Sequence, residues 1–373
     1  MEFRDLKKQY KALQPAMDRA VQEAIAAAHF ISGPQVKQLE EALAEYVGMK
    51  HCITCANGTD ALTLACKALK IGPGDAVFVP DFTFFATAEV VAEEGAMPIL
   101  VDVQDDTYNM SPLALETAIE QVLEKGEYVP KAIIAVDLFG LPADYPAIRA
   151  IADKYHLLII EDGAQGFGGR IGDQKACSFG DISTTSFFPA KPLGCYGDGG
   201  AVFTSNDEWA TLIRSYAVHG KGVDKYDNVR IGMNSRLDTL QAAILLVKFD
   251  AFVREELPAI NEAASWYDAL LPADLKKPIV PDGYYSSWAQ YTIQLESEAQ
   301  RSKVQEALKE QGIPAMIYYR TPMHAEGAFA DLLYEGTCPN TERLCRTVLS
   351  LPIHPYIEKE DVQKVCEAVR ACL

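Results

Sequence analysis

Short apolar runs, bounded by Gly, Pro or Asp, recur along the first two thirds of the chain with helical or loop stretches between them. Runs of this length are typical of buried strands, and their alternation with helices favours an α/β layer with a mainly parallel sheet. We predict seven strands, at residues 51–55, 75–80, 97–103, 131–139, 157–162, 182–187 and 200–205. The first intervening helix should pack on the sheet, because apolar side chains recur at i, i+3, i+4 and i+7 in Leu62, Ala65, Cys66 and Leu69.

The last third of the chain has a different pattern. From residue 237 a long helix is predicted to bridge two domains, with one apolar side formed by Leu237, Leu240, Ile244 and Val247. Beyond it we predict helices near 258–271, 300–311 and 358–371 and a strand at 286–295. The expected fold is a large α/β domain at residues 1–248 and a smaller C-terminal α+β domain at residues 249–373.

Composition and charge narrow the class of protein. With 373 residues, 49% of them hydrophobic and 23% charged, the chain is an ordinary globular protein. The 34 Lys and Arg residues against 52 Asp and Glu give a net charge of −18, which disfavours nucleic acid as a partner. The start MEFRDLKKQYKAL lacks the apolar core of a signal peptide, and no later run reaches membrane-spanning length, so we predict a cytoplasmic protein without a membrane partner.

The nine cysteines are scattered, as expected of reduced thiols. Cys52 and Cys55 form a single C-x-x-C motif in an apolar run, without the second pair that a zinc site needs. We therefore interpret both as buried strand cysteines and expect no metal site.

The segment SFFPAKPLGCYGDGGA, residues 186–201, encloses Lys191 between prolines and glycines at the end of a predicted strand. A lysine held in such a turn can be desolvated, which lowers its pKa and makes it a nucleophile for carbonyl groups. An ordinary loop lysine is the alternative.

A carboxylate ends the predicted strand LLIIED, where Asp162 precedes GAQGFGG. Ligands bind at the carboxyl ends of parallel strands in open α/β sheets. There Asp162 could pair with the cationic ring nitrogen of pyridoxal phosphate, with Gln165 near a ring substituent. A helix N-cap is the alternative role for Asp162.

Asn57, Gly58 and Thr59 form a predicted turn between a strand and a helix. Backbone N–H groups at such a helix N-terminus bind phosphate, although simple capping by Thr59 or Asp60 fits equally well. Of the three rings in DFTFFATAE, at 82, 84 and 85, one could stack on a flat cofactor while the others fill the core.

The chain resembles the sugar aminotransferases of the DegT/DnrJ/EryC1/StrS family in six segments of the same order and spacing: NGTDAL, DFTFFATAE, IIEDGAQGFG, SFFPAKPLGCYGDGG, GMNSRLDTLQAAIL and LSLPIHPYI. The resemblance covers nearly the whole chain. It implies a fold type I pyridoxal phosphate enzyme that works as a homodimer with shared active sites. Within the family the chain resembles members that aminate UDP-2-acetamido-2-deoxy-3-oxo-glucuronate for the O-antigen of lipopolysaccharide.

The resemblance also implies roles for single residues. Lys191 would carry the cofactor and Asp162 would face its ring nitrogen, with Gln165 near the ring hydroxyl and Phe84 stacked on the ring. The phosphate would be held by Gly58, Thr59 and Ser186, and by Asn234 from the partner subunit. The usual amino donor of the family is L-glutamate. Departures from the family pattern at Gly163, Phe167, Tyr318 and Glu326 affect the sugar end of the site more than the cofactor end.

A sugar nucleotide is an anion, so an acidic chain needs a local group of cations to bind it. Residues 219–236 supply Lys221, Lys225, Arg230 and Arg236, and we predict that Arg236 meets a uronate carboxylate. Further candidates for sugar contacts are Tyr196, Tyr319 and His324, with aromatic packing as the alternative for the tyrosines.

Other functions remain as rivals: a dTDP- or UDP-linked 3-keto or 4-keto 6-deoxysugar aminotransferase, and a non-catalytic regulatory protein that binds pyridoxal phosphate. A dehydratase of this fold would carry His in place of Lys191. An NAD-dependent reductase is disfavoured, because GCYGDGG lacks the G-x-G-x-x-G spacing.

Overall fold

The structure, a computed structural model, describes residues 1–224, 226–330 and 336–373. A seven-stranded sheet lies at its centre, with the strand order β1-β9-β8-β5-β4-β2-β3. All seven predicted strands are confirmed, with these bounds: β1 His51–Cys55, β2 Asp75–Pro80, β3 Met97–Val101, β4 Val129–Val136, β5 Leu158–Asp162, β8 Ile182–Ser186 and β9 Gly200–Thr204. Only β9 runs against its neighbours, so the sheet is mainly parallel, as predicted.

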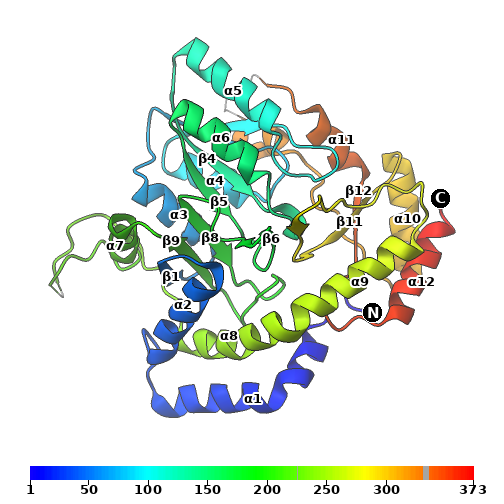
Figure 1. Cartoon of the computed structure of the whole chain (residues 1–373), viewed down its shortest axis with the longest axis horizontal. Coiled ribbons are helices and arrows are strands. Elements are labelled where there is room, and N and C mark those ends of the chain that lie inside the picture. Colours follow the sequence, from blue (N-terminus) through cyan, green and yellow to red (C-terminus); the bar gives the residue numbers. More distant parts are fainter. Residues whose placement is uncertain (225, 331–335) are drawn as a thin grey trace.

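Helices cover both faces of this sheet, which makes a three-layer sandwich (Figure 1). Alternate side chains of a strand point to opposite faces, and both faces are apolar here. One face packs against α3 (Gly58–Ala68), α4 (Ala86–Glu93) and α7 (Asp207–Tyr216). The other packs against α5 (Pro112–Lys125) and α6 (Tyr145–Tyr155) near one edge, and α2 (Pro34–Val47) and α8 (Thr239–Ala251) near the other. Cys52 and Cys55 are buried in β1, as predicted.

The predicted bridging helix runs on, through one π-helical turn, into the helix predicted near 258–271. α8 ends at Ala251, a π-helical turn η2 (Phe252–Glu256) follows, and α9 (Leu257–Leu270) continues from it (Figure 1). In this turn the Leu257 N–H bonds the Phe252 carbonyl, five residues back. Pro258 has no N–H to donate, which accounts for the shift in the hydrogen-bond ladder. The predicted domain boundary at residue 248 therefore falls inside a helix, and the division stays a prediction.

The C-terminal part forms a second, smaller layer. A two-stranded antiparallel sheet of β11 (Tyr291–Gln294) and β12 (Val348–Leu351) packs with α10 (Glu298–Glu310) and α12 (Lys359–Arg370). The strand predicted at 286–295 is shorter, because Ser287 and Gln290 donate their N–H groups to Gly140 and Phe139 instead of to a strand. The other elements are α11 (Pro339–Thr347), the short strands β6 (Arg170–Ile171), β7 (Gln174–Lys175) and β10 (Tyr284–Tyr285), and the 3-10 turns η1 (Leu138–Gly140), η3 (Met323–Ala325) and η4 (Gly327–Phe329).

The N-terminal helix α1 (Leu6–Ala27) lies beside α8 (Figure 1). Asp5 caps it by accepting a hydrogen bond from the Lys8 N–H. Within the described part of the chain, no helix combines the length and hydrophobicity that crossing a lipid bilayer requires.

Candidate functional site

A cavity of about 980 Å³ opens at the carboxyl ends of the parallel strands. The last residues of β4, β5 and β8 line it: Val136, Asp162 and Ser186. Open α/β sheets bind ligands at this edge, since the loops that follow the strands leave a crevice there. Eight of the residues predicted for the site line this one cavity: Gly58, Thr59, Phe84, Asp162, Gln165, Ser186, Lys191 and Tyr319.

Asp162 is a buried carboxylate at the end of β5. The Thr87 hydroxyl donates to its Oδ2 at 2.9 Å, and the Ala164 N–H donates to its Oδ1 at 3.2 Å. Burial raises the pKa of Asp162, while these two hydrogen bonds and the nearby Lys191 charge lower it. The carboxylate is therefore held in place and would gain from a cationic partner in the cavity.

Lys191 lies in the tight loop after β8. Its N–H bonds the Phe188 carbonyl at 2.9 Å, and the Cys195 N–H bonds the Phe187 carbonyl at 2.8 Å. Gly194 is required here, because a Cβ would come within 2.6 Å of the Phe188 carbonyl oxygen. Burial lowers the pKa of the Lys191 amine, whereas Asp162 raises it. A neutral amine is the form that attacks carbonyl groups and accepts protons.

The N-terminus of α3 forms an anion-binding end of the cavity. Asn57 caps the helix by accepting from the Asp60 N–H at 2.7 Å, so neither Thr59 nor Asp60 is the cap. The first N–H groups of a helix have no partner within it, and those of Gly58 and Thr59 lie at the cavity. A Cβ at Gly58 would lie 2.7 Å from the Ser186 Cβ, so glycine lets the end of β8 approach the helix.

An aromatic and an amide side chain border the middle of the cavity. Phe84, which is 55% exposed, and the half-buried Phe85 both line the cavity, whereas Phe82 is buried in the core; stacking of Phe84 on a cofactor stays a prediction. Gln165 is held at both ends: its Oε1 accepts the Phe139 N–H at 2.9 Å, and its Nε2 donates to the Tyr319 hydroxyl at 3.2 Å.

Two further candidates for sugar contacts lie outside the cavity lining. The centre of the Tyr196 ring lies 4.9 Å from the buried Lys248 Nζ. The backbone N–H of Tyr196 donates to Gln241 Oε1 at 2.9 Å. His324 pairs through Nδ1 with the buried Asp81 carboxylate at 2.7 Å. Their contact with a sugar stays a prediction.

Asn234 and Arg236 flank Ser235, whose Oγ accepts the Ala56 N–H at 3.0 Å. This contact holds the segment close to the start of α3, but neither Asn234 nor Arg236 lines the cavity of its own chain. For Asn234 the prediction is a contact from a partner subunit, which a single chain does not test.

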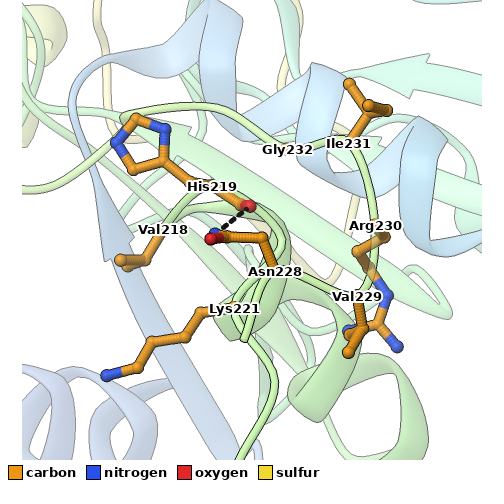
Figure 2. A pocket seen from close by; sticks show the side chains of 8 residues that line it. All are labelled: Val218, His219, Lys221, Asn228, Val229, Arg230, Ile231 and Gly232. Carbon is orange, nitrogen blue, oxygen red and sulfur yellow. Dashed lines mark hydrogen bonds between the residues drawn. The ribbon is translucent and has the colours of Figure 1, made fainter. Parts of the chain in front are cut away.

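Residues 218–221 and 228–232 border a separate, open pocket of about 850 Å³ (Figure 2). Of the four predicted cations, Lys221 and Arg230 line it, Arg236 does not, and Lys225 lies outside the described residues. Figure 2 shows the Lys221 and Arg230 side chains extending away from each other. Arg230 donates to Ser215 Oγ at 2.5 Å and lies over the Tyr216 ring, so among the described residues Lys221 and Arg230 do not form a single cluster.

The residues of the large cavity suit pyridoxal phosphate. A helix N-terminus with Ser186 suits its phosphate, the buried Asp162 carboxylate suits a cationic ring nitrogen, and Lys191 is an amine of lowered pKa. The fold and this combination define a class: pyridoxal-phosphate-dependent transferases built on a mainly parallel seven-stranded sheet.

Comparisons with known proteins show which family within this class the chain belongs to. Residues 12–370 match the DegT/DnrJ/EryC1/StrS aminotransferase family, and the chain belongs to it. Its enzyme class and cofactor are those predicted: it is a sugar aminotransferase dependent on pyridoxal phosphate.

Three relatives match over almost their whole length. The UDP-2-acetamido-2-deoxy-3-oxo-D-glucuronate aminotransferase of Pseudomonas aeruginosa is 44% identical over 370 residues, 99% of each chain. The UDP-N-acetyl-3-dehydro-alpha-D-glucosamine 3-aminotransferase of Acidithiobacillus ferrooxidans is 42% identical, covering 99% of this chain and 97% of the relative. The crystal structure of a DegT DnrJ EryC1 StrS aminotransferase from Brucella abortus is 47% identical, with a TM-score of 0.97 and coverage of 100% and 99%.

Proposed function

We propose that this protein transfers the amino group of L-glutamate to the keto group of UDP-2-acetamido-2-deoxy-3-oxo-glucuronate, in the cytoplasm, for cell-surface polysaccharide such as the O-antigen. The observation that carries the proposal is the cavity in which Lys191 and Asp162 stand beside an anion-binding helix N-terminus. The relative of 44% identity supports the choice of sugar.

In this proposal five of the cavity residues take part in binding the cofactor or in moving protons. The Gly58 and Thr59 N–H groups and Ser186 bind the cofactor phosphate, and Asp162 holds a proton on the ring nitrogen. When bound, pyridoxal phosphate supplies an electron sink that stabilises negative charge at the reacting carbon. Lys191 Nζ takes the proton from the glutamate α-carbon in one half-reaction, and it delivers a proton to the sugar carbon that receives the amine in the other. Glutamate leaves as 2-oxoglutarate, and the ketone becomes an amine.

The proposed active enzyme is a homodimer. Among the described residues that line the cavity, Lys191 is the single cation, whereas the acidic ones are Asp60, Asp162, Asp198 and Glu326. A sugar nucleotide therefore needs cations from elsewhere, and residues 219–236 of a second copy would supply them, with Arg236 at the uronate carboxylate. Two apolar side chains are suited to be covered by a second copy: Phe188, 51% exposed at the cavity, and Ile231, 90% exposed in the loop.

A second candidate substrate is a UDP-linked 3-keto sugar without a carboxylate. The relative of 42% identity favours it by name. The acidic residues of this cavity favour it too, because Glu326 would repel a uronate carboxylate that came near it.

The test uses purified protein loaded with pyridoxal phosphate, L-glutamate and a panel of keto sugar nucleotides, with products identified by mass. We expect amination of the 3-keto uronate at the highest kcat/KM. Lys191→Ala should abolish amination and the absorbance of the lysine-bound cofactor, whereas Lys37→Ala, at an exposed lysine of α2, should change neither. Unchanged activity in Lys191→Ala would refute the proposal.

A further inference from the structure

The short segment ahead of α1 lies against the wall of the cavity. The Phe3 ring meets the ring of Tyr318, a cavity residue, edge-on at 6.3 Å. Arg4 Nη2 donates to the carbonyl of Pro192, the residue after Lys191, at 3.1 Å. These partners are 188 positions apart in the sequence. The N-terminus, marked in Figure 1 near α9 and α12, is therefore joined to the lysine loop by a hydrogen bond.

Besides its hydrogen bond to Pro192, the Arg4 guanidinium feels one nearby buried carboxylate. Its carboxylate neighbour is the buried Glu256 in η2, which attracts the Arg4 charge. Glu256 is itself anchored, since it accepts hydrogen bonds from Gln9 Nε2 at 2.8 Å and from the Tyr356 hydroxyl at 2.7 Å. Lys8, on the same turn of α1 as Gln9, donates to the Tyr356 carbonyl at 3.3 Å.

The guanidinium remains a cation in spite of its burial. Burial lowers the pKa of Arg4 to about 10, which still leaves it charged at neutral pH. Its Nη1 is buried and has no hydrogen-bond acceptor among the described residues. A fixed positive charge therefore lies beside the loop that carries Lys191.

Two charged residues act on the Lys191 amine: Asp162 in β5 and Arg4 in the segment before α1. Asp162 in β5 favours the protonated amine, whereas burial and Arg4 both favour the neutral amine. Arg4 acts in the same direction on two other buried bases, Lys248 in α8 and His354, whose pKa values are lowered first by burial. Glu256 opposes the effect of Arg4 on Lys248.

We propose that Arg4 is a positioning residue for Lys191: its hydrogen bond to the Pro192 carbonyl holds the Lys191 loop in place, and it sets a fixed positive charge beside that loop. This inference rests on the proposed function, in which Lys191 Nζ moves the protons. No contact between Arg4 and a substrate is part of it.

The test measures the Lys191 amine itself, in full-length protein freed of cofactor. Trace acetylation with acetic anhydride over a series of pH values, read by mass spectrometry of the Lys191 peptide, gives the pH at which this amine loses its proton. In Arg4→Gln we expect the profile to move to higher pH, because a neighbouring positive charge is lost. Arg19→Gln, at an exposed arginine of α1, changes the net charge equally and should leave the profile in place.

Two further variants separate charge from tether and guard against misfolding. Arg4→Lys keeps the charge and should keep the profile closer to that of the wild type than Arg4→Gln does. Deletion of residues 2–4 removes the guanidinium but leaves the Asp5 cap of α1, so this variant should fold and shift the profile as Arg4→Gln does. In the loaded enzyme, the rising limb of the kcat profile should move in the same direction. On that limb the rate at a fixed pH should fall about tenfold for every pH unit that the limb moves.

An Arg4→Gln or deletion variant with the wild-type acetylation profile would overturn the inference. Failure of the proposed function gives a different result, because the acetylation needs no sugar and no donor. A shifted Lys191 profile in a protein that aminates no keto sugar would refute the proposed function and leave the link between Arg4 and Lys191 intact.

Discussion

Two buried carboxyl groups directly behind the candidate site offer a sharp test of the physical account. Asp137 follows β4 and Glu161 lies in β5, and neither side chain has any exposure. Their carboxyl groups hydrogen-bond each other, and burial together with the Glu161 charge raises the pKa of Asp137 well above its usual value. Two carboxylates next to each other in a buried setting repel, so we expect the pair to share one proton.

The hydrogen bonds place this proton on Asp137. Glu161 accepts from the N–H groups of Cys177, Phe179 and Gly180 and from the Ser183 hydroxyl, which suits a carboxylate. The Oδ1 of Asp137 accepts from the Tyr145 hydroxyl at 2.8 Å, but its Oδ2 meets no donor in the described part of the chain. Asp137 Oδ2 needs no donor if it carries the shared proton itself and donates it to the Glu161 carboxylate.

The two matched substitutions should therefore differ. Asp137→Asn keeps a donor towards Glu161, so the free energy of unfolding should change by no more than about 1 kcal/mol. Glu161→Gln turns one accepting oxygen into an NH₂ group that faces N–H donors. One or two buried groups lose their partners at about 1–3 kcal/mol each, which predicts a loss of about 1–6 kcal/mol.

The pH dependence adds a second readout. The folded protein keeps the Asp137 proton above the pH at which the unfolded chain loses it, so stability falls as pH rises between the two pKa values, by about 1.4 kcal/mol per pH unit. Asp137→Asn should remove this slope. Urea unfolding followed by circular dichroism at a series of pH values measures both effects. Equal stability of the two variants, or an unchanged slope in Asp137→Asn, would refute the reasoning.

Three substitutions test the site itself. Asp162→Asn removes the carboxylate expected to face the ring nitrogen, and steady-state assays should show kcat lowered by about 100-fold or more. If Asp162 only caps a turn, kcat should stay near that of the wild type. Thr87→Val deletes the hydroxyl that donates to Asp162, and equilibrium dialysis should show cofactor binding weakened by about two- to tenfold; unchanged affinity would contradict the role of that hydrogen bond. Arg236→Ala should raise the KM for the nucleotide-linked keto-uronate by about tenfold or more and leave unchanged the KM for a nucleotide-linked keto sugar without a carboxylate. Equal effects on the two KM values would argue against a carboxylate contact.

Local sequence patterns accounted for the sheet and for the meeting of several candidate site residues at one edge of it. A strand is recognised from a few adjacent residues, and the carboxyl ends of parallel strands meet at one edge whatever the details of packing. Asp162, Ser186 and Lys191 could therefore be placed together before their distances were known. Phe84 could be separated from Phe82 only in the structure, because exposure depends on the elements that pack above each ring.

The contacts that escaped prediction join segments distant in the sequence. Nothing in the N-terminal residues signals that Arg4 reaches Pro192, and Asp137 looks like one more polar residue at the end of a strand. The π-helical turn before Pro258 could have been suspected from the proline, but its consequence, the placement of Glu256 near Arg4, depends on how α1 packs. The sugar end depends on Arg236, which lies away from the cavity of its own chain, and Asn234 is predicted to reach the cofactor phosphate from a partner subunit.

The central claim is that this chain moves an amino group from glutamate to a keto sugar nucleotide. The most direct measurement supplies ¹⁵N-labelled L-glutamate and UDP-2-acetamido-2-deoxy-3-oxo-glucuronate to the loaded enzyme and follows both products by mass spectrometry. We expect ¹⁵N in the sugar nucleotide, 2-oxoglutarate in equal amount, and neither product with Lys191→Ala. Formation of 2-oxoglutarate without label in any keto sugar of the panel would contradict it.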